Sequence, residues 1–297
     1  MTDETIIPTA EPEVIVDLPA VTGEGPLWNE AERVLYWVDI PPGRLYRYDP
    51  ATGDNILAYQ HDGMIGGFTF QADGSLLLFC DEGKVLRWSG GSVETVIENV
   101  PAEAGGRFND VTAGPDGHVF CGTMATASGT ARLYRLEHDA SLTLLFDDIG
   151  LSNGFGFSLD HRTMYHTDTT GRVIYRLDYE PGTGEVRNRE VLIRTPDDES
   201  MPDGMTVDRE GTLWSARWDG HALYRYGADG SPLGKVPFPV KKVSSIAFGG
   251  ETYDDAYVTT ATGPGGRSPE EGELAGSLFR VNLGVGGRPP FLSRIEL

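Results

Sequence analysis

The sequence predicts an all-β protein, a six-bladed β-propeller with four-stranded blades, formed by residues 1–297 as a single domain. Its main evidence is a tripeptide of an apolar residue, an aromatic or aliphatic residue and Arg, which occurs six times, 40 to 55 residues apart. Strand-type segments flank each copy, and 39 glycines and 19 prolines supply turns for many short strands. Repeats of this length are typical of β units that bury their faces only against one another. The copies occupy residues 45–47, 85–87, 133–135, 174–176, 223–225 and 278–280.

Within each repeat, the strands follow a fixed order. An inner strand leads through a tight turn into a second strand, as in residues 68–70 and 76–79 on either side of Asp73-Gly74. Asp-Gly pairs between β-rich runs are hairpin signals. The repeated tripeptide forms the third strand, and we interpret its arginines as structural residues that pair along strand edges. A fourth strand is predicted at residues 56–59, 93–97, 142–146, 190–193 and 235–238.

The sixth repeat has no fourth strand of its own before the chain ends. Residues 13–17 have a strand-type sequence and precede the first repeat, so we expect them to pair with the last blade and close the ring. We expect no helix. The longer loops, residues 196–202 and 262–276, are expected at blade ends, where they would shape the mouth of a pocket.

The charge of the chain narrows the range of partners. With 45 acidic and 24 basic residues the net charge is −21, which argues against nucleic acid and against an anionic membrane surface. We see no signal peptide and no apolar run long enough to span a membrane, so we predict a cytoplasmic protein. Its two cysteines are expected to be buried free thiols. A monomer and a small homo-oligomer both stay open.

A ring of equivalent residues emerges when the six inner strands are aligned. A propeller brings the starts of these strands together at one end of its channel. Two carboxylates there would raise each other's pKa unless a cation lies between them, and carboxylate and carboxamide oxygens suit a hard divalent cation. We therefore predict one divalent metal ion (Ca²⁺, Mg²⁺, Mn²⁺, Zn²⁺ or Fe²⁺), although Asn-Gly and Asp-Gly pairs are also ordinary turn sequences. The ring consists of Glu24, Gly66, Asn109, Asn153, Asp203 and Ser244.

Charged and aromatic residues flank this ring. Arg107, two residues before Asn109, is either a surface residue paired with an acid or a cation that holds an oxygen-rich ligand at the channel mouth. We interpret Asp110 as the partner of Arg107 or as a strand-start cap. Trp218 and Asp219 follow a second strand and would line the same mouth.

The motifs of the chain, taken in order, resemble those of the senescence-marker-protein/gluconolactonase family, which includes regucalcin. The resemblance spans the whole chain and implies a six-bladed propeller that hydrolyses a sugar lactone with a divalent metal. The matching segments are GEGPLW at 23–28, LYWVDI at 35–40, RFND at 107–110, GTM at 122–124, SNG at 152–154, PDGM at 202–205 and YVTT at 257–260.

The resemblance also implies a role for individual residues. Glu24, Asn153 and Asp203 would bind the metal ion, and Asp203 would also be the catalytic acid/base. Arg107 and Asn109 would contact the substrate, although the position of Asn109 is a metal ligand in related phosphotriesterases. One segment departs from the pattern. Regucalcin-like members carry a substrate-contacting Glu shortly after GTM, whereas here residues 125–128 read ATAS.

Together these features predict a hydrolase of carbohydrate metabolism. It would be a gluconolactonase-like, metal-dependent lactonase whose partner is a small-molecule sugar (aldono-) lactone, opened to the aldonic acid. Two alternatives stay open at this stage. One is a non-catalytic calcium-binding propeller, and the other is a phosphotriesterase-type hydrolase that uses the same metal ring.

Overall fold

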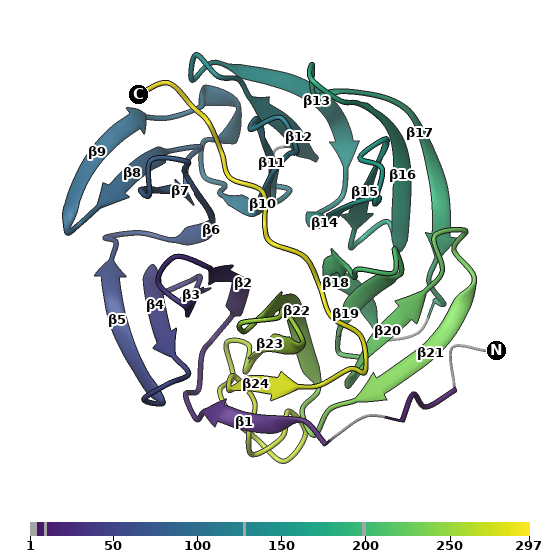
Figure 1. The fold of residues 1–297 in the computed structure, drawn as a ribbon. Helices are drawn as coiled ribbons and strands as arrows, with labels where there is room; N and C mark the ends of the chain where they lie inside the picture. The colour runs from purple at the N-terminus through teal and green to yellow at the C-terminus, as the bar shows by residue number, and fades with distance from the viewer. Residues whose placement is uncertain (1–4, 9–10, 127–128, 198–199) are drawn as a thin grey trace.

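A computed structural model describes residues 5–8, 11–126, 129–197 and 200–297. Its strands form six four-stranded antiparallel sheets, arranged as blades around a central channel (Figure 1). The six-bladed propeller predicted from the repeats is confirmed. Within the described ranges the sole helix is a single 3₁₀ turn, Pro101–Glu103, in the loop that enters the third blade.

The first three blades follow one another along the chain. Blade 1 consists of β2 (Gly23–Asn29), β3 (Val34–Asp39), β4 (Arg44–Asp49) and β5 (Asp54–Gln60). Blade 2 consists of β6 (Ile65–Phe70), β7 (Leu76–Cys80), β8 (Val85–Ser89) and β9 (Ser92–Ile97). Blade 3 consists of β10 (Phe108–Ala113), β11 (Val119–Thr123), β12 (Ala131–Leu136) and β13 (Leu142–Ile149).

The last three blades complete the circle. Blade 4 consists of β14 (Ser152–Phe157), β15 (Thr163–Asp168), β16 (Val173–Glu180) and β17 (Glu185–Arg194). Blade 5 consists of β18 (Met201–Val207), β19 (Leu213–Trp218), β20 (Ala222–Tyr226) and β21 (Pro232–Pro237). Blade 6 consists of β22 (Lys242–Gly249), β23 (Asp255–Ala261), β24 (Leu278–Val281) and β1 (Glu13–Val16). The strand β1 pairs antiparallel with β24, so the predicted closure by the N-terminal segment is confirmed.

The hydrophobic core lies between neighbouring blades. Second strands such as β3 and β7 are buried along their whole length, whereas outer strands such as β5 and β9 are largely exposed. Clusters of buried apolar side chains join one blade to the next, as where the rings of Phe79 and Phe108 meet edge to face at 5.4 Å. Each blade is therefore stable only within the ring. Both cysteines are buried and free, as predicted.

The six repeated arginines have the structural role that the sequence suggested. Each forms an ion pair with a nearby carboxylate, and three of the six carboxylates lie in the turn between the inner and the second strand of a blade. The pairs that are exposed add little stability individually. The pairs are Arg47–Glu32, Arg87–Asp73, Arg135–Glu137, Arg176–Glu190, Arg225–Asp208 and Arg280–Glu13.

Every inner strand has a β-bulge near its start. In all six blades the register between the inner and the second strand shifts at or beside the ring position. A bulge bends the strand and redirects side chains, so the ring residues face the channel instead of following simple alternation. The shifts fall between Glu24 and Leu27, Ile65 and Gly67, Phe108 and Val111, Asn153 and Phe155, Pro202 and Met205, and Val243 and Ser245.

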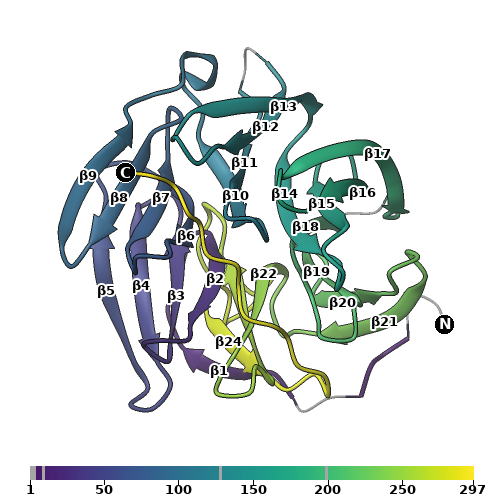
Figure 2. The same ribbon diagram turned by 45° about the horizontal axis from the view of Figure 1, so that its top comes forward.

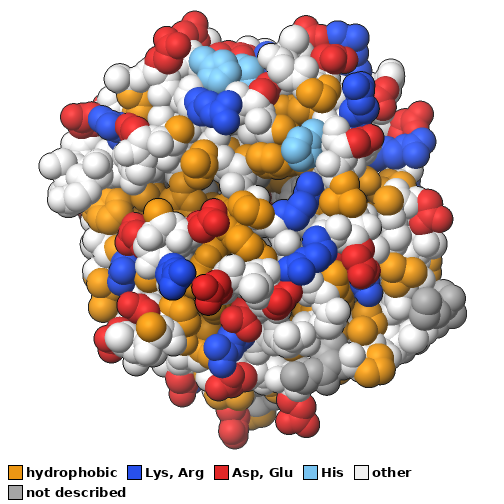
Figure 3. All heavy atoms as spheres, in the orientation of Figure 1, with side chains coloured by type: hydrophobic (Ala, Val, Ile, Leu, Met, Phe, Trp, Pro, Cys, Tyr) orange, Lys and Arg blue, Asp and Glu red, His pale blue; other side chains and the backbone are white. Residues whose placement is uncertain are grey.

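The two ends of the channel differ. The inner strands begin at the ring end, whereas the C-terminal segment crosses the opposite end (Figures 1 and 2). We call residues 286–296 of this segment the strap. It is hydrogen-bonded to blades 2 to 6, through Phe70, Gly117, Phe157, Arg209 and Tyr253. Figure 3 shows this face, where apolar side chains gather around the centre together with some basic ones, and acidic side chains are scattered from near the centre to the rim. Within the described ranges, no helix is long and apolar enough to cross a membrane.

Candidate active site

Four of the six ring residues come together as polar groups inside the channel. Glu24, Asn109, Asn153 and Asp203 are each at most 5% exposed. They come from blades 1, 3, 4 and 5, so the cluster exists only in the closed ring. Hydrogen bonds and electrostatic interactions connect them. The sequence alignment of inner strands therefore selected residues that the fold does bring together.

Asn153 and Asp203 are directly bonded. The Nδ2 group of Asn153 donates to Oδ1 of Asp203 and, at 3.1 Å, to Oγ1 of Thr169. The Thr169 hydroxyl in turn donates to the carbonyl oxygen of Pro202 at 2.8 Å. This network fixes the side chains of blades 4 and 5 against each other.

Asn109 links the guanidinium of Arg107 to blade 4. The Nη1 group of Arg107 donates to Oδ1 of Asn109 at 2.6 Å and to the carbonyl oxygen of Phe108 at 2.8 Å. Asn109 itself donates through Nδ2 to the carbonyl oxygen of Ser152 at 2.8 Å. The structure therefore places the two predicted substrate-binding residues side by side, with the oxygen of Asn109 already engaged by a cation.

Glu24 has little direct compensation for its burial. Its carboxylate accepts one hydrogen bond, from the backbone N–H of Gly25 at 3.0 Å. Within the described ranges it forms no ion pair. A buried carboxylate with a single neutral donor is costly, and such groups in proteins are usually paired or bound to a metal.

Excess negative charge is the main electrostatic feature of the site. Burial, reinforced by Asp110 and by Asp203, holds the pKa of Glu24 well above its usual value. The pKa of Asp203 is likewise well above its usual value because of burial and Asp110, against which the hydrogen bond from Asn153 acts. Burial lowers the pKa of Arg107 to about 10, although the nearby carboxylates oppose this shift. One guanidinium is thus surrounded by several acids in a poorly solvated space.

The remaining two ring positions are structural. A Cβ atom at Gly66 would lie 2.0 Å from the carbonyl oxygen of Phe108, so only glycine lets blades 2 and 3 approach this closely. The hydroxyl of Ser244 donates to the carbonyl oxygen of Gly23 at 2.6 Å and so ties blade 6 to blade 1. These two residues hold the ring together and contribute no open donor to the cluster.

Asp110 does not make the contacts that the sequence suggested. Within the described ranges its carboxylate accepts no hydrogen bond and has no ion pair within 4.0 Å, so it is neither a direct partner of Arg107 nor a cap. Burial has the largest effect on the pKa of Asp110 and raises it to about 7. Arg107 acts on Asp110 only by a longer-range electrostatic interaction, which opposes this shift. The alignment of the inner strands could have drawn attention to Asp110, because this residue directly follows the ring residue Asn109.

Lys242 organises the residues predicted to line the mouth on the side of blades 5 and 6. Its ammonium lies 2.9 Å from the carboxylate of Asp219, 2.6 Å from that of Glu271 and 5.6 Å from the ring centroid of Trp218. The predicted loop of residues 262–276 supplies Glu271, so it does lie at the ring end. In the segment after GTM, Ala127 and Ser128 lie outside the described residues, whereas Ala125 and Thr126 are described.

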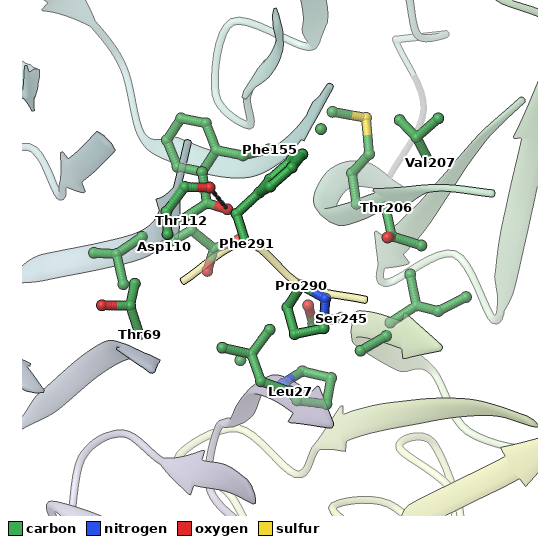
Figure 4. Close-up of a pocket in the computed structure, with 18 of the residues that line it drawn as sticks. Leu27, Thr69, Asp110, Thr112, Phe155, Thr206, Val207, Ser245, Pro290 and Phe291 are labelled. Carbon is green, nitrogen blue, oxygen red and sulfur yellow. Dashed lines mark hydrogen bonds between the residues drawn. The ribbon is translucent and has the colours of Figure 1, made fainter. Parts of the chain in front are cut away.

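A chamber of about 430 Å³ lies in the channel beyond the ring. Its wall consists of inner-strand residues that follow the ring positions, and Pro290 and Phe291 of the strap extend across it (Figure 4). Most of the lining is apolar, with Asp110 as its only carboxylate among the described residues. Within those residues no three His, Cys, Asp or Glu side chains form a metal-binding group. The predicted ligand set instead combines two carboxylates with the carboxamide of Asn153.

The fold and the cluster define a class of protein, a six-bladed propeller with a buried, acid-rich polar site in its channel. Residues 22–262 match the family described as "SMP-30/Gluconolactonase/LRE-like region". The chain belongs to this family, as the ordered motifs of the sequence predicted.

Named relatives cover nearly the whole chain. Pentonolactonase XacC of Haloferax volcanii is 44% identical over 288 residues, which are 95% of this chain and 98% of the relative. Regucalcin of Gallus gallus is 34% identical over 280 residues, 91% of this chain and 93% of the relative. A solved structure of regucalcin from Agrobacterium tumefaciens, described as a calcium-binding protein, covers 98% of this chain and 99% of its own, with 27% identity and a TM-score of 0.90.

Proposed function

We propose that this protein is a metal-dependent lactonase that hydrolyses a sugar lactone, with pentonolactones as the first substrate class to test. The observation that carries the proposal is the 44% identity to a pentonolactonase along almost the full length of both chains. The site agrees with it, because a polyhydroxylated ester fits a cluster of carboxylates, carboxamides and one guanidinium.

The ligand set fits a hard divalent cation. Glu24 and Asp203 are buried carboxylates whose pKa values are raised by burial and by neighbouring acids, so a cation between them would favour their ionised forms. Asn153 is bonded to Asp203 through Nδ2, and a half-turn of its amide would present Oδ1 as the third donor. Such a cation supplies a Lewis acid that polarises the ester carbonyl.

Asp203 is the proposed acid/base. Hydrolysis adds water to the lactone carbonyl carbon and breaks the bond from that carbon to the ring oxygen. The carboxylate of Asp203 would take a proton from the attacking water and return a proton to the departing ring oxygen, which becomes a hydroxyl.

Arg107 and Asn109 are the proposed substrate-binding pair. Asn109 uses its oxygen to hold the guanidinium at 2.6 Å, which favours a role in positioning the substrate over metal ligation. The remaining N–H groups of Arg107 can donate to the carbonyl or hydroxyl oxygens of a lactone. No acid occurs in the sequence between Met124 and Gly129, so hydroxyl recognition here differs from that implied by the regucalcin-like pattern.

A panel assay tests the proposal. The EDTA-treated protein is supplied with Ca²⁺, Mg²⁺, Mn²⁺, Zn²⁺ or Fe²⁺ and assayed with pentono- and hexonolactones and with a phosphotriester. We expect lactone hydrolysis that disappears with EDTA and returns with at least one metal. Tight calcium binding without turnover of any substrate would identify a binding protein, and turnover confined to the phosphotriester would identify a phosphotriesterase. Either result would refute the lactonase.

A further inference from the structure

The bulge in β10 brings two consecutive polar side chains, Asn109 and Asp110, to the channel. Asn109 belongs to the ring, and Asp110 occupies the next position toward the chamber. At that next position every other blade has a small uncharged residue. These residues are Gly25, Gly67, Gly154, Gly204 and Ser245. Blade 3 alone therefore places a charge one step inside the ring.

Packing requires a small residue in blades 4 and 5, whereas in blade 1 the backbone favours glycine, because Gly25 has a φ of +54°. A Cβ atom at Gly154 would lie 2.5 Å from the carbonyl oxygen of Asp203, and one at Gly204 would lie 2.2 Å from Oγ of Ser245. These positions are closed by the adjacent blade. Asp110 instead has room because its side chain faces the chamber (Figure 4).

Asp110 has no contact that would compensate its charge. In the described part of the chain its carboxylate has no hydrogen bond and no ion pair, and most of the chamber lining is apolar. A half-buried carboxylate without a partner is partly desolvated and gains no contact in return, so fold stability does not account for this residue. A bound ligand of opposite charge would account for it.

The charges at this end of the channel do not balance. Glu24, Asp203 and Asp110 interact electrostatically with one another and with Arg107. When ionised, the three acids exceed the single guanidinium by two charges. The next acid, Asp219, is 2.9 Å from the ammonium of Lys242, which also pairs with Glu271 at 2.6 Å. Among Glu24, Asp203, Asp110 and Arg107 alone, the missing charge equals that of one divalent cation.

We infer that Asp110 is a positioning residue for the cation of this site: its carboxylate, outside the ligand set of Glu24, Asn153 and Asp203, completes the charge that holds a divalent ion. This inference rests on the metal site proposed above. The second acid next to the ring would make the site prefer a divalent cation to a monovalent one, because only a double charge neutralises the cluster.

Calcium titration by isothermal calorimetry, on protein freed of metal with EDTA, tests this role. The variants are Asp110→Asn and, as a matched control, Asp219→Asn, an equally conservative change at an acid that is ion-paired with Lys242. We expect the Kd for Ca²⁺ to rise about 10- to 100-fold in Asp110→Asn, the range seen when residues around metal ligands are changed. The control should change Kd by less than about twofold.

The melting temperature of the metal-free protein is a second measurement, because a positioning role and a structural role of Asp110 predict opposite changes in it. Asp110→Asn removes an unpaired carboxylate, so the metal-free variant should melt higher than wild type while gaining less from added calcium. A purely structural Asp110 would lower the melting temperature instead. If Asp110→Asn misfolds, Asp110→Gly replaces it with the residue that four other blades have at this position.

The outcomes separate this inference from the proposed function. Wild-type protein that binds no divalent cation would refute the metal site and the role of Asp110 together. Wild-type binding with unchanged Kd in the Asp110 variants would refute only the role of Asp110. Equal weakening in the Asp110 and Asp219 variants would show a general effect of protein charge and would also refute it.

Discussion

The two ends of the central channel use the same six strands in different ways. At the ring end, Glu24 and Asp203 are buried with few direct partners and with raised pKa values. At the strap end, the same strands continue as an apolar lining, and Phe291 packs edge to face against Phe157 at a centroid distance of 5.6 Å. One end concentrates unfavourable charge, and the other concentrates apolar contact.

This difference shows how the fold supports its site. Buried charged groups with few direct partners are tolerated only where the surrounding structure holds them in place. Here the interblade clusters, the closure by β1 and the strap provide that support away from the ring end. Changes at the ring end should therefore affect chemistry and metal binding, and changes at the strap end should affect stability.

The largest effect is expected from Asp203→Asn. The change keeps the shape of the side chain but removes its charge and its ability to take a proton, so kcat/KM for the lactone should fall by about 10³-fold or more. Steady-state kinetics with a saturating metal measures it. The control is Thr206→Val, three residues along the same strand and in the chamber wall, where we expect a change below about twofold. Activity in Asp203→Asn above a tenth of wild type would contradict the assignment.

Acid sensitivity should also come from the ring end. His166 is fully buried, its Nε2 lies 2.8 Å from Oγ of Ser152, and burial lowers its pKa to about 3. The unfolded chain binds this proton near its ordinary pKa of about 6.5, so the contribution of neutral His166 is complete above that pH and is lost as pH falls toward 3. The loss should be on the order of 3 kcal/mol by pH 4.

Urea unfolding of wild type and His166→Gln between pH 4 and pH 8 checks this prediction. The variant should lack that part of the pH dependence. The control is His161→Gln at the strap end, where the imidazole contacts Phe291 at a centroid distance of 5.1 Å but is only partly buried. Its profile should stay close to wild type. Identical profiles for wild type and His166→Gln would refute the argument.

A smaller effect, confined to stability, is expected from Phe291→Ala at the strap end. The change removes the contacts with Phe157 and His161, so the free energy of unfolding should fall by on the order of 2 kcal/mol. Chemical denaturation measures the loss, and kcat and KM should stay within about twofold of wild type. The neighbouring Leu292→Ala, at a side chain that is 43% exposed, serves as control and should cost less than about 0.5 kcal/mol. A parallel loss of activity in Phe291→Ala would show that the two ends are not independent.

Much of the fold could be predicted because it repeats. The spacing of the arginine tripeptide predicts the number of blades. The strand-type segment at 13–17 predicts how the ring closes, because this segment has no blade of its own and the sixth blade lacks one strand. The strap could not be predicted in this way. Residues 286–296 form no strand, and their contacts join chain segments that are distant in sequence.

The candidate site could be predicted only as a set of positions. The alignment of the six inner strands selected Glu24, Asn109, Asn153 and Asp203, and all four are buried in the channel. Their partners followed no sequence rule: the contact of Asn109 with Ser152 and the isolation of Asp110 depend on how blades meet. Nor does the sequence reveal the bulges, because the extra residue of a bulge need not be of any particular type.

The amino-acid sequence was enough to predict the repeat, the number and order of the blades, and the residues that occupy equivalent places in them. These properties follow from local periodicity and from turn chemistry, which act between neighbours in the chain. The three-dimensional structure was needed to show which of the equivalent residues belong to the candidate site and which hold the ring together. That distinction depends on burial and on the distances between charges from different blades, and closure of the ring sets both.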